Sequence, residues 1–244
     1  MPITRSEILG LPIDALTMAD AVEWLELNLL SADVTKLVFT ADSNAFISAQ
    51  TDPAYADLFD KADLITPDSA GPVWALAKSG VSLPGRVSGV DLVEELCILA
   101  AKHEKAIYFV GSAPGVAVAA AENLSQKYPG FKVAGARDGY FKPTEDEDVA
   151  RAIAITQPDI LVVAMGMPRQ EQFILKTASI INAKIGIGVG GSLDVHSGTV
   201  KRAPVIIQKL KIEWLWRFIL NPKKIAKVKN LPVFYWRVSR QKQK

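Results

Sequence analysis

The amino-acid sequence predicts an α/β fold in which helices cover both faces of a parallel sheet, followed by a helical C-terminal appendage. Short apolar runs of strand length recur along the first 195 residues, several of them end in glycine, and segments of helical periodicity separate them. Near-continuous apolar runs of this kind are typical of parallel strands buried on both faces. Their alternation with helical segments is the pattern of a parallel sheet.

Six runs are predicted to be strands, and the clearest of them read AIYFVG, DILVVAMG and KIGIGVGG. The predicted strands span residues 36–40, 63–66, 106–111, 131–135, 159–165 and 184–189. The predicted helices span residues 17–30, 53–61, 89–103, 114–128, 144–156 and 168–179. Ligands of open parallel sheets bind beyond the carboxyl ends of the strands, so the residues that follow each strand are the first candidates for a functional site.

The composition changes near residue 195, where we place a boundary between an α/β body, residues 1–195, and an appendage, residues 196–244. The appendage holds 13 Lys or Arg and one acid, whereas the body holds 15 basic and 25 acidic residues. The net charge of +2 therefore combines an acidic body with a strongly basic tail. Such a tail predicts an anionic partner: nucleic acid, acidic lipid head groups or a phosphorylated substrate. Pro222 and Pro232 should divide the appendage into short helices.

Composition also disfavours several classes of protein. A single cysteine, Cys97, excludes an intramolecular disulfide and fits a reducing cytosol. The N-terminus lacks the apolar core of a signal peptide, and no apolar run reaches the roughly 18–20 residues of a membrane-spanning helix. We therefore expect a soluble protein, or one attached to a membrane from one side only. Neither G-x-S-x-G nor a Cys–His pairing is present, which argues against nucleophilic hydrolase chemistry.

Polar side chains follow the first two predicted strands directly. Within KLVFTADSNAF, residues 36–46, Thr40 and Asp42 lie where the predicted strand ends, and Asp68 follows ADLITP. The carboxyl ends of parallel strands share one edge of a sheet, so these residues are expected where a ligand would bind. Asp68 is the best candidate for a general base, because a carboxylate can accept a hydroxyl proton as that oxygen attacks.

Two glycine-rich turns follow later strands. Gly111 and Gly115 separate a strand from a helix, and Gly190 lies within GVGGSLD, residues 188–194. Glycine allows a close approach to a phosphate, and a helix N-terminus offers unpaired N–H groups. A tight turn, or the close approach of another backbone, would explain the glycines equally well. The spacing matches neither the dinucleotide fingerprint nor a P-loop.

No convincing metal site is present. Asp146-x-Asp148 has a spacing found at metal sites, but Thr144 with Glu147 three residues later predicts a capping box at a helix start. His103 and His196 are too few and too scattered for a zinc site. The turn GMPRQEQF places Arg169 and Gln170 in the first turn of a helix, as an exposed helix start or as part of a site.

Taken in order, a set of motifs resembles the WecG/TagA/CpsF family of bacterial glycosyltransferases, from about residue 8 to residue 236. No single motif is specific, but the ordered set is. The motifs are FTADSNAF, ADLITPDSAGPVWA, RVSGVDLVEEL, YFVGSAPGVA, KYPGFKVAGARDGYF, PDILVVAMGMPRQEQFI and IGVGGSLDVHSGTVKRAP with IEWLWRF.

This resemblance implies an inverting hexosyltransferase with a Rossmann-like body and no cofactor. Members move a sugar such as N-acetylmannosamine from a UDP-sugar to N-acetylglucosamine on a polyprenyl diphosphate. The product enters cell wall biogenesis, as teichoic acid, common antigen, capsule or exopolysaccharide. The appendage is expected to hold the enzyme on the inner face of the cytoplasmic membrane, as a peripheral protein, and to complete the active site. Homo-oligomers are compatible with the sequence.

The resemblance also implies roles for individual residues. Asp68 matches the general base and Thr40 a pocket threonine important for activity. Arg86 and Gln170 match polar residues of the pocket, and the cations expected to face the donor diphosphate are Arg217, Lys224 and Lys227. Asp42 stands where the family often has asparagine, and Ser69 follows Asp68 where glycine is common. The first change replaces an amide with an acceptor-only carboxylate, which leaves another UDP-hexose or a uronic acid open as the donor.

Two other functions compete with this interpretation. A nucleic-acid-binding protein would use the basic tail, but the acidic body would repel a long polyanion and no known module fits. A nucleotide-dependent oxidoreductase is disfavoured because G-x-G-x-x-G is missing. We therefore expect a UDP-sugar, a polyprenyl-linked acceptor and a membrane surface as partners, and no nucleic acid.

Overall fold

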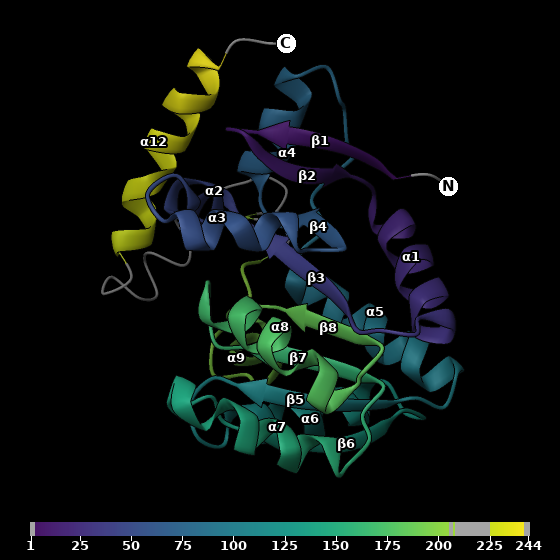
Figure 1. Ribbon diagram of the computed structural model, residues 1–244. Helices are drawn as coiled ribbons and strands as arrows, with labels where there is room; N and C mark the ends of the chain where they lie inside the picture. Colours follow the sequence, from purple (N-terminus) through teal and green to yellow (C-terminus); the bar gives the residue numbers. More distant parts are fainter. Residues whose placement is uncertain (1–2, 205–206, 208–224, 242–244) are drawn as a thin grey trace.

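A computed structural model describes residues 3–204, 207 and 225–241 of the chain (Figure 1). Its core is a six-stranded, wholly parallel sheet in the order β4-β3-β8-β7-β5-β6, which confirms the predicted α/β, Rossmann-like class. The strands are β3 (Lys36–Ala41), β4 (Leu64–Pro67), β5 (Ala106–Gly111), β6 (Lys132–Arg137), β7 (Ile160–Ala164) and β8 (Ile185–Gly188). Each of the six predicted strands is confirmed, with ends shifted by at most two residues.

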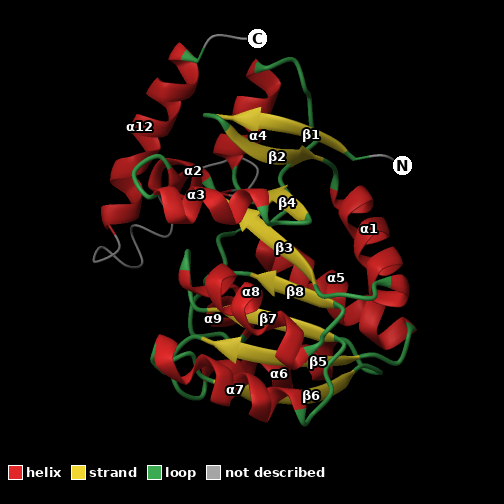
Figure 2. Ribbon diagram, in the orientation of Figure 1, coloured by secondary structure: helices red, strands yellow, loops and turns green. Residues whose placement is uncertain are grey.

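Helices cover both faces of this sheet (Figure 2). On one face pack α2 (Ser43–Ala49), α3 (Pro53–Asp60), α4 (Ala70–Lys78), α7 (Asp146–Ala154), α8 (Arg169–Ile181) and α12 (Ile225–Arg240). On the other pack α1 (Met18–Ser31), α5 (Gly89–Lys102), α6 (Val116–Lys127) and α9 (Ser192–His196). The six predicted helices correspond to α1, α3, α5, α6, α7 and α8, whereas α2, α4 and α9 were not predicted.

An antiparallel hairpin, β1 (Thr4–Ile8) and β2 (Leu11–Ala15), lies beside the β4 edge and was also not predicted. Its turn residues Leu9 and Gly10 both have positive φ, as a tight hairpin turn requires. Asp14 on β2 accepts a hydrogen bond of 2.7 Å from the Ile65 N–H and pairs with Arg5 at 2.8 Å. This buried carboxylate attaches the hairpin to the sheet.

The predicted capping box of Thr144 and Glu147 at the start of α7 is wrong. Thr144 lies inside a short 3₁₀ turn, η1 (Pro143–Glu145), that precedes the helix. Glu145 accepts a hydrogen bond of 2.7 Å from the Lys142 N–H, so this capping contact is made two residues earlier than predicted. The proline at the first position of the turn fixes φ and favours this earlier start.

Helix α12 contains Pro232, so the prediction that this proline ends a helix is wrong. Proline removes one backbone hydrogen bond and usually kinks a helix. Here the following turns are anchored by Phe234 and Val238, which are buried against α2 and α4. Pro222, Trp214 and Trp216 lie outside the described residues. The division into a body and an appendage stays a prediction.

Strands β3 and β8 are neighbours, yet the helices that follow them lie on opposite faces of the sheet: α2 follows β3 and α9 follows β8. The chain therefore diverges beyond the carboxyl ends of these two strands. In open α/β sheets this is where ligands bind. Among the described residues, no helix is long and apolar enough to cross a membrane.

Candidate active site

The site is assembled where the ends of β3, β4 and β8 meet the start of α5. Asp68 directly follows β4, and its Oδ1 accepts a hydrogen bond of 3.0 Å from the Gly89 N–H. A Cβ added at Gly89 would lie 3.4 Å from Thr40 Oγ1 and 3.2 Å from Ser192 Oγ. The Asp68 N–H also bonds the Ala41 carbonyl at 3.1 Å. Thr40 and Asp68, predicted from separate motifs, therefore lie in one small region.

Thr40 is buried, and its hydroxyl donates a hydrogen bond of 2.7 Å to the Gly188 carbonyl. This contact ties the end of β3 to the end of β8 through a side chain. Because the hydroxyl proton is already used, the oxygen can offer only its lone pairs to a ligand. Thr40 is therefore suited to accept a hydrogen bond from a sugar hydroxyl or amide.

Asp42 has a structural role as the N-cap of α2. Its Oδ1 accepts hydrogen bonds from the N–H groups of Asn44 at 2.8 Å and Ala45 at 3.0 Å. Asparagine and aspartate cap helices about equally well. The departure from the family pattern at this position therefore preserves the helix start. Contact between Asp42 and a substrate stays a prediction.

Gln170 is 1% exposed and joins two loops at the strand ends. Its Oε1 accepts from the Gly190 N–H at 3.0 Å, in the loop after β8, and from the Gly166 N–H at 3.2 Å, in the loop after β7. Its Nε2 donates to Glu171 Oε1 at 2.6 Å. Gln170 thus holds the glycine turns together, whereas its predicted contact with substrate stays a prediction.

The two glycines selected from the sequence lie in different surroundings. A Cβ added at Gly111 would lie 2.4 Å from the Ala164 carbonyl oxygen, so close packing of two strands already requires glycine there. At Gly190, with φ of +54°, an added Cβ would meet nothing within 4 Å. Among the described residues the space beside Gly190 is thus unfilled, and contact of a ligand with Gly190 or of a phosphate with Gly111 stays a prediction.

Arg86 is half-buried beside the N-terminus of α5. It lines a small cavity of about 30 Å³ together with residues of α5 and of the chain beyond α9, including Ser88, Lys201 and Arg202. The cavity thus gathers three cationic residues beside the N-terminus of α5. Of the predicted cations of the appendage, Arg217 and Lys224 lie outside the described residues. Lys227 belongs to α12, where only its backbone is described.

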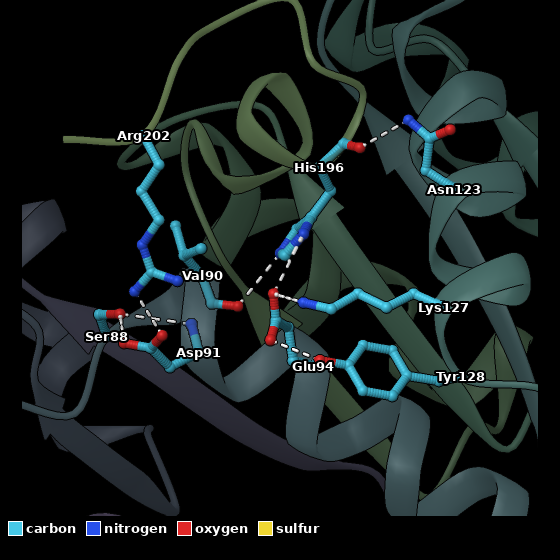
Figure 3. Close-up of polar contacts among 9 residues, drawn as sticks. All are labelled: Ser88, Val90, Asp91, Glu94, Asn123, Lys127, Tyr128, His196 and Arg202. Carbon is cyan, nitrogen blue, oxygen red and sulfur yellow. Dashed lines mark hydrogen bonds and ion pairs between the residues drawn. The ribbon is translucent and has the colours of Figure 1, made fainter. Parts of the chain in front are cut away.

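Figure 3 shows how the first residues of the predicted appendage are held against α5. Arg202 forms an ion pair with Asp91 in the first turn of the helix. Asp91 also accepts a hydrogen bond of 2.6 Å from the hydroxyl of Ser88, the N-cap residue. This helix start is also the one whose Gly89 N–H binds Asp68. The segment that leads into the appendage is therefore anchored next to the proposed base.

A second set of contacts on the same helix involves His196 (Figure 3). Its Nε2 lies 3.1 Å from the Val90 carbonyl, and its Nδ1 lies 3.9 Å from Glu94. Burial lowers the pKa of His196, which favours the neutral ring near neutral pH. Glu94 also binds Lys127 at 2.9 Å and the Tyr128 hydroxyl at 2.5 Å. His196 thus joins α9, α5 and α6, in agreement with the structural role predicted for it.

Asp146 and Asp148, whose spacing resembles that of metal-binding acids, do not converge. Asp146 is buried and pairs with Arg169 and Lys176 of α8, while the Asp148 side chain is 86% exposed. Arg169 is therefore part of the contact between α7 and α8. Within the described part of the chain, no group of three or more His, Cys, Asp or Glu side chains is placed to share a metal ion.

Glu171 is the site residue that the sequence did not reveal. An acid in the first turn of a helix usually complements the helix dipole at the surface. Here it is 0% exposed, and burial raises the pKa of its carboxyl to about 7. Within the part of the chain that the structure describes, its Oε2 has no hydrogen-bond partner. The alternating glycines of GIGVGG were the one available signal that a side chain packs closely against this strand. A Cβ added at Gly188 would lie only 2.9 Å from Glu171 Oε1.

Comparison with known proteins shows the family to which the chain belongs. An N-acetylglucosaminyldiphosphoundecaprenol N-acetyl-beta-D-mannosaminyltransferase of Staphylococcus aureus strain MRSA252 is 34% identical over 241 residues, which cover 98% of this chain and 94% of that protein. The protein of the same name from strain NCTC 8325 / PS 47 is 33% identical over 241 residues, with the same coverage. A model of the glycosyl transferase WecG/TagA/CpsF family matches residues 6–244. The chain therefore belongs to the WecG/TagA/CpsF family of glycosyltransferases.

Proposed function

We propose that this protein transfers an N-acetylmannosamine-type sugar from a UDP-sugar to N-acetylglucosamine linked to a polyprenyl diphosphate. The name of its relatives describes a mannosaminyl transfer to that class of acceptor. The observation that carries the proposal is the placement of Asp68. Its carboxylate lies beyond the strand ends, oriented by the first amide of α5 and close to Thr40.

In the proposed reaction Asp68 is the general base. Its carboxylate accepts the proton of the acceptor hydroxyl as that oxygen forms a bond to the anomeric carbon of the donor. The bond from this carbon to the diphosphate breaks, and UDP leaves with the electron pair. Attack from the face opposite the leaving group inverts the configuration. The product is a disaccharide on the lipid diphosphate, a precursor of a cell-surface polymer.

The charge that develops on UDP is met by cations instead of a metal ion in this proposal. Arg86 lines a cavity with Ser88, which directly precedes the Gly89 whose N–H binds Asp68, and Arg217, Lys224 and Lys227 are the further cations that the family resemblance implies. Fixed positive groups aimed at a leaving group stabilise the transition state where its charge develops. Asp146, one of the two acids whose spacing resembles that of a metal site, is already paired with Arg169 and Lys176. This pairing supports a reaction without a metal.

The lipid acceptor implies work at the inner surface of the cytoplasmic membrane. On α12 the Trp236 side chain is 53% exposed, and the Arg240 guanidinium lies 4.2 Å from the centre of its ring. Exposed tryptophan beside arginine suits the head-group region of a membrane. These residues support a peripheral attachment through the appendage.

Replacement of Asp68 tests the proposed base. In a transfer assay with UDP-N-acetylmannosamine and a short-chain polyprenyl-diphosphate N-acetylglucosamine, Asp68→Asn should lower turnover by roughly 10²–10⁴-fold, the range for loss of a general base. Asp52→Asn is the matched control: Asp52 caps α3 away from the site, and asparagine caps a helix equally well. Near-normal turnover of Asp68→Asn would remove Asp68 from the catalytic role.

Chelation tests the proposal that no metal is needed. Turnover of the wild-type enzyme should persist in EDTA, because side-chain cations are expected to meet the diphosphate charge. The assay compares initial rates with EDTA, without it, and with added Mg²⁺ or Mn²⁺. Complete loss of activity in chelator, with recovery on addition of metal, would contradict this mechanism. Donors with other hexoses or uronic acids in the same assay identify the sugar.

A further inference from the structure

We propose that Glu171 is a positioning residue: its buried carboxyl fixes the side-chain amide of Gln170 in the orientation that joins the glycine turns of the active site. The role of the turns in catalysis rests on the proposed function, whereas the orientation of the amide follows from contacts alone. Glu171 is 0% exposed, so it acts through Gln170 and not by contact with substrate.

The orientation matters because the two ends of a glutamine amide have the same shape but opposite hydrogen-bonding properties. Both the Gly166 and Gly190 N–H groups point at one end of the Gln170 amide, which must therefore be the oxygen. A rotation of 180° would place an NH₂ group against two N–H donors. Glu171 prevents this rotation, since its Oε1 accepts a hydrogen bond from Nε2 at 2.6 Å.

The contacts extend from Glu171 to the catalytic residues. Gly188 has no side chain, which leaves room for both Gln170 and Glu171: an added Cβ would lie 2.7 Å from Gln170 Nε2 and 2.9 Å from Glu171 Oε1. On the same residue, the carbonyl accepts the Thr40 hydroxyl. The acid and its glutamine therefore support the loop after β8 and the residue that orients Thr40.

The surroundings of Glu171 do not favour stability. Its Oε2 has no hydrogen-bond partner among the described residues, and the same holds for the buried hydroxyl of Tyr55 on α3. A buried polar atom without a partner costs about 1–3 kcal/mol, and an apolar side chain of similar size would avoid this cost. Natural proteins depart from optimal packing of this kind mainly at functional sites. The need to hold the neighbouring Gln170 amide in place explains why a buried acid stands here instead of an apolar side chain.

The test compares Glu171→Leu, which removes the acceptor and keeps a similar volume, with Glu171→Gln, which keeps an acceptor oxygen. Glu171→Leu should fold and lower kcat by about tenfold to a hundredfold, the range for partners that orient a catalytic group. Amide hydrogen exchange at Gly166 and Gly190 should become at least about tenfold faster while exchange in the core strands stays unchanged. Glu171→Gln should restore most of the turnover and protection.

Two controls separate positioning from a general effect of a buried substitution. Thr177→Val removes a buried polar group from the same helix, because the Thr177 hydroxyl donates to the Phe173 carbonyl away from Gln170. This variant should leave exchange at both glycines and kcat unchanged. On a Gln170→Leu background, Glu171→Leu should have no further effect on kcat, because both residues act through one amide.

Unchanged exchange at both glycines, or a full additional loss in the double variant, would overturn the positioning role. If Glu171→Leu does not fold, the proposal is tested with Glu171→Gln and Gln170→Leu: Gln170→Leu must then show the faster exchange that Glu171→Gln does not. If the wild-type enzyme transfers no sugar with any donor, the proposed function fails, while the exchange measurements still decide the role of Glu171.

Discussion

Neutralising Glu171 should change how the stability of the protein depends on pH. Burial raises the pKa of this carboxyl from 4.5 to about 7 in the folded protein. The folded state therefore holds this proton more tightly than the unfolded chain does. The stabilising contribution is fully present below pH 4.5, falls as the pH rises, and is lost above pH 7. Glu171→Gln removes the titrating group and keeps its shape.

The size of the effect follows from the two pKa values. Each pKa unit corresponds to about 1.4 kcal/mol, so the whole shift is worth about 3 kcal/mol. Between pH 5 and pH 8 the wild-type protein should lose about 2–3 kcal/mol of unfolding free energy through this group. Other groups titrate in the same range, with the His196 pKa lowered by burial among them. They are present in both proteins, so they cancel when the variant is compared with the wild type.

Denaturant unfolding of both proteins at pH 5, 6, 7 and 8 measures this difference. The advantage of Glu171→Gln over the wild type should grow by about 2–3 kcal/mol from pH 5 to pH 8. Any difference in stability between the amide and the neutral acid at this position is the same at every pH, so it does not affect the slope. If the unfolding free energies of the two proteins change in parallel with pH, the pKa of Glu171 is not raised by burial, and the reasoning is refuted.

Two further predictions concern elements that frame the site. Phe234→Ala should lower the unfolding free energy by about 3–5 kcal/mol, because the ring is fully buried 6.0 Å from that of Phe46 and its removal leaves a cavity. A loss below about 1 kcal/mol in denaturant unfolding would show that α12 is not part of the cooperative fold. Asp42→Ala should cost about 0.5–2 kcal/mol by loss of the α2 cap, whereas Asp42→Asn should be nearly neutral. Equal losses in thermal unfolding would argue against capping.

The strands and most helices could be predicted because their signals are local. A strand buried on both faces is apolar throughout, and an amphipathic helix repeats its apolar residues every three or four positions. The missed elements lack such signals. The β1 strand TRSEI is mostly exposed and polar, and α2 has only seven residues. Pro232 was interpreted from its local effect, which burial of Phe234 and Val238 overrides.

The sequence by itself determined the α/β class, the family and the polar residues at the strand ends, because chain composition and motif order carry this information. Only the tertiary structure decided what those residues do. Thr40 uses its proton on the Gly188 carbonyl, Asp42 caps a helix, and Gln170 joins two loops through an amide that also donates a hydrogen bond to Glu171. These contacts link segments up to 148 residues apart. Strand order and helix packing bring such segments together, and no local pattern in the chain encodes the distances between them.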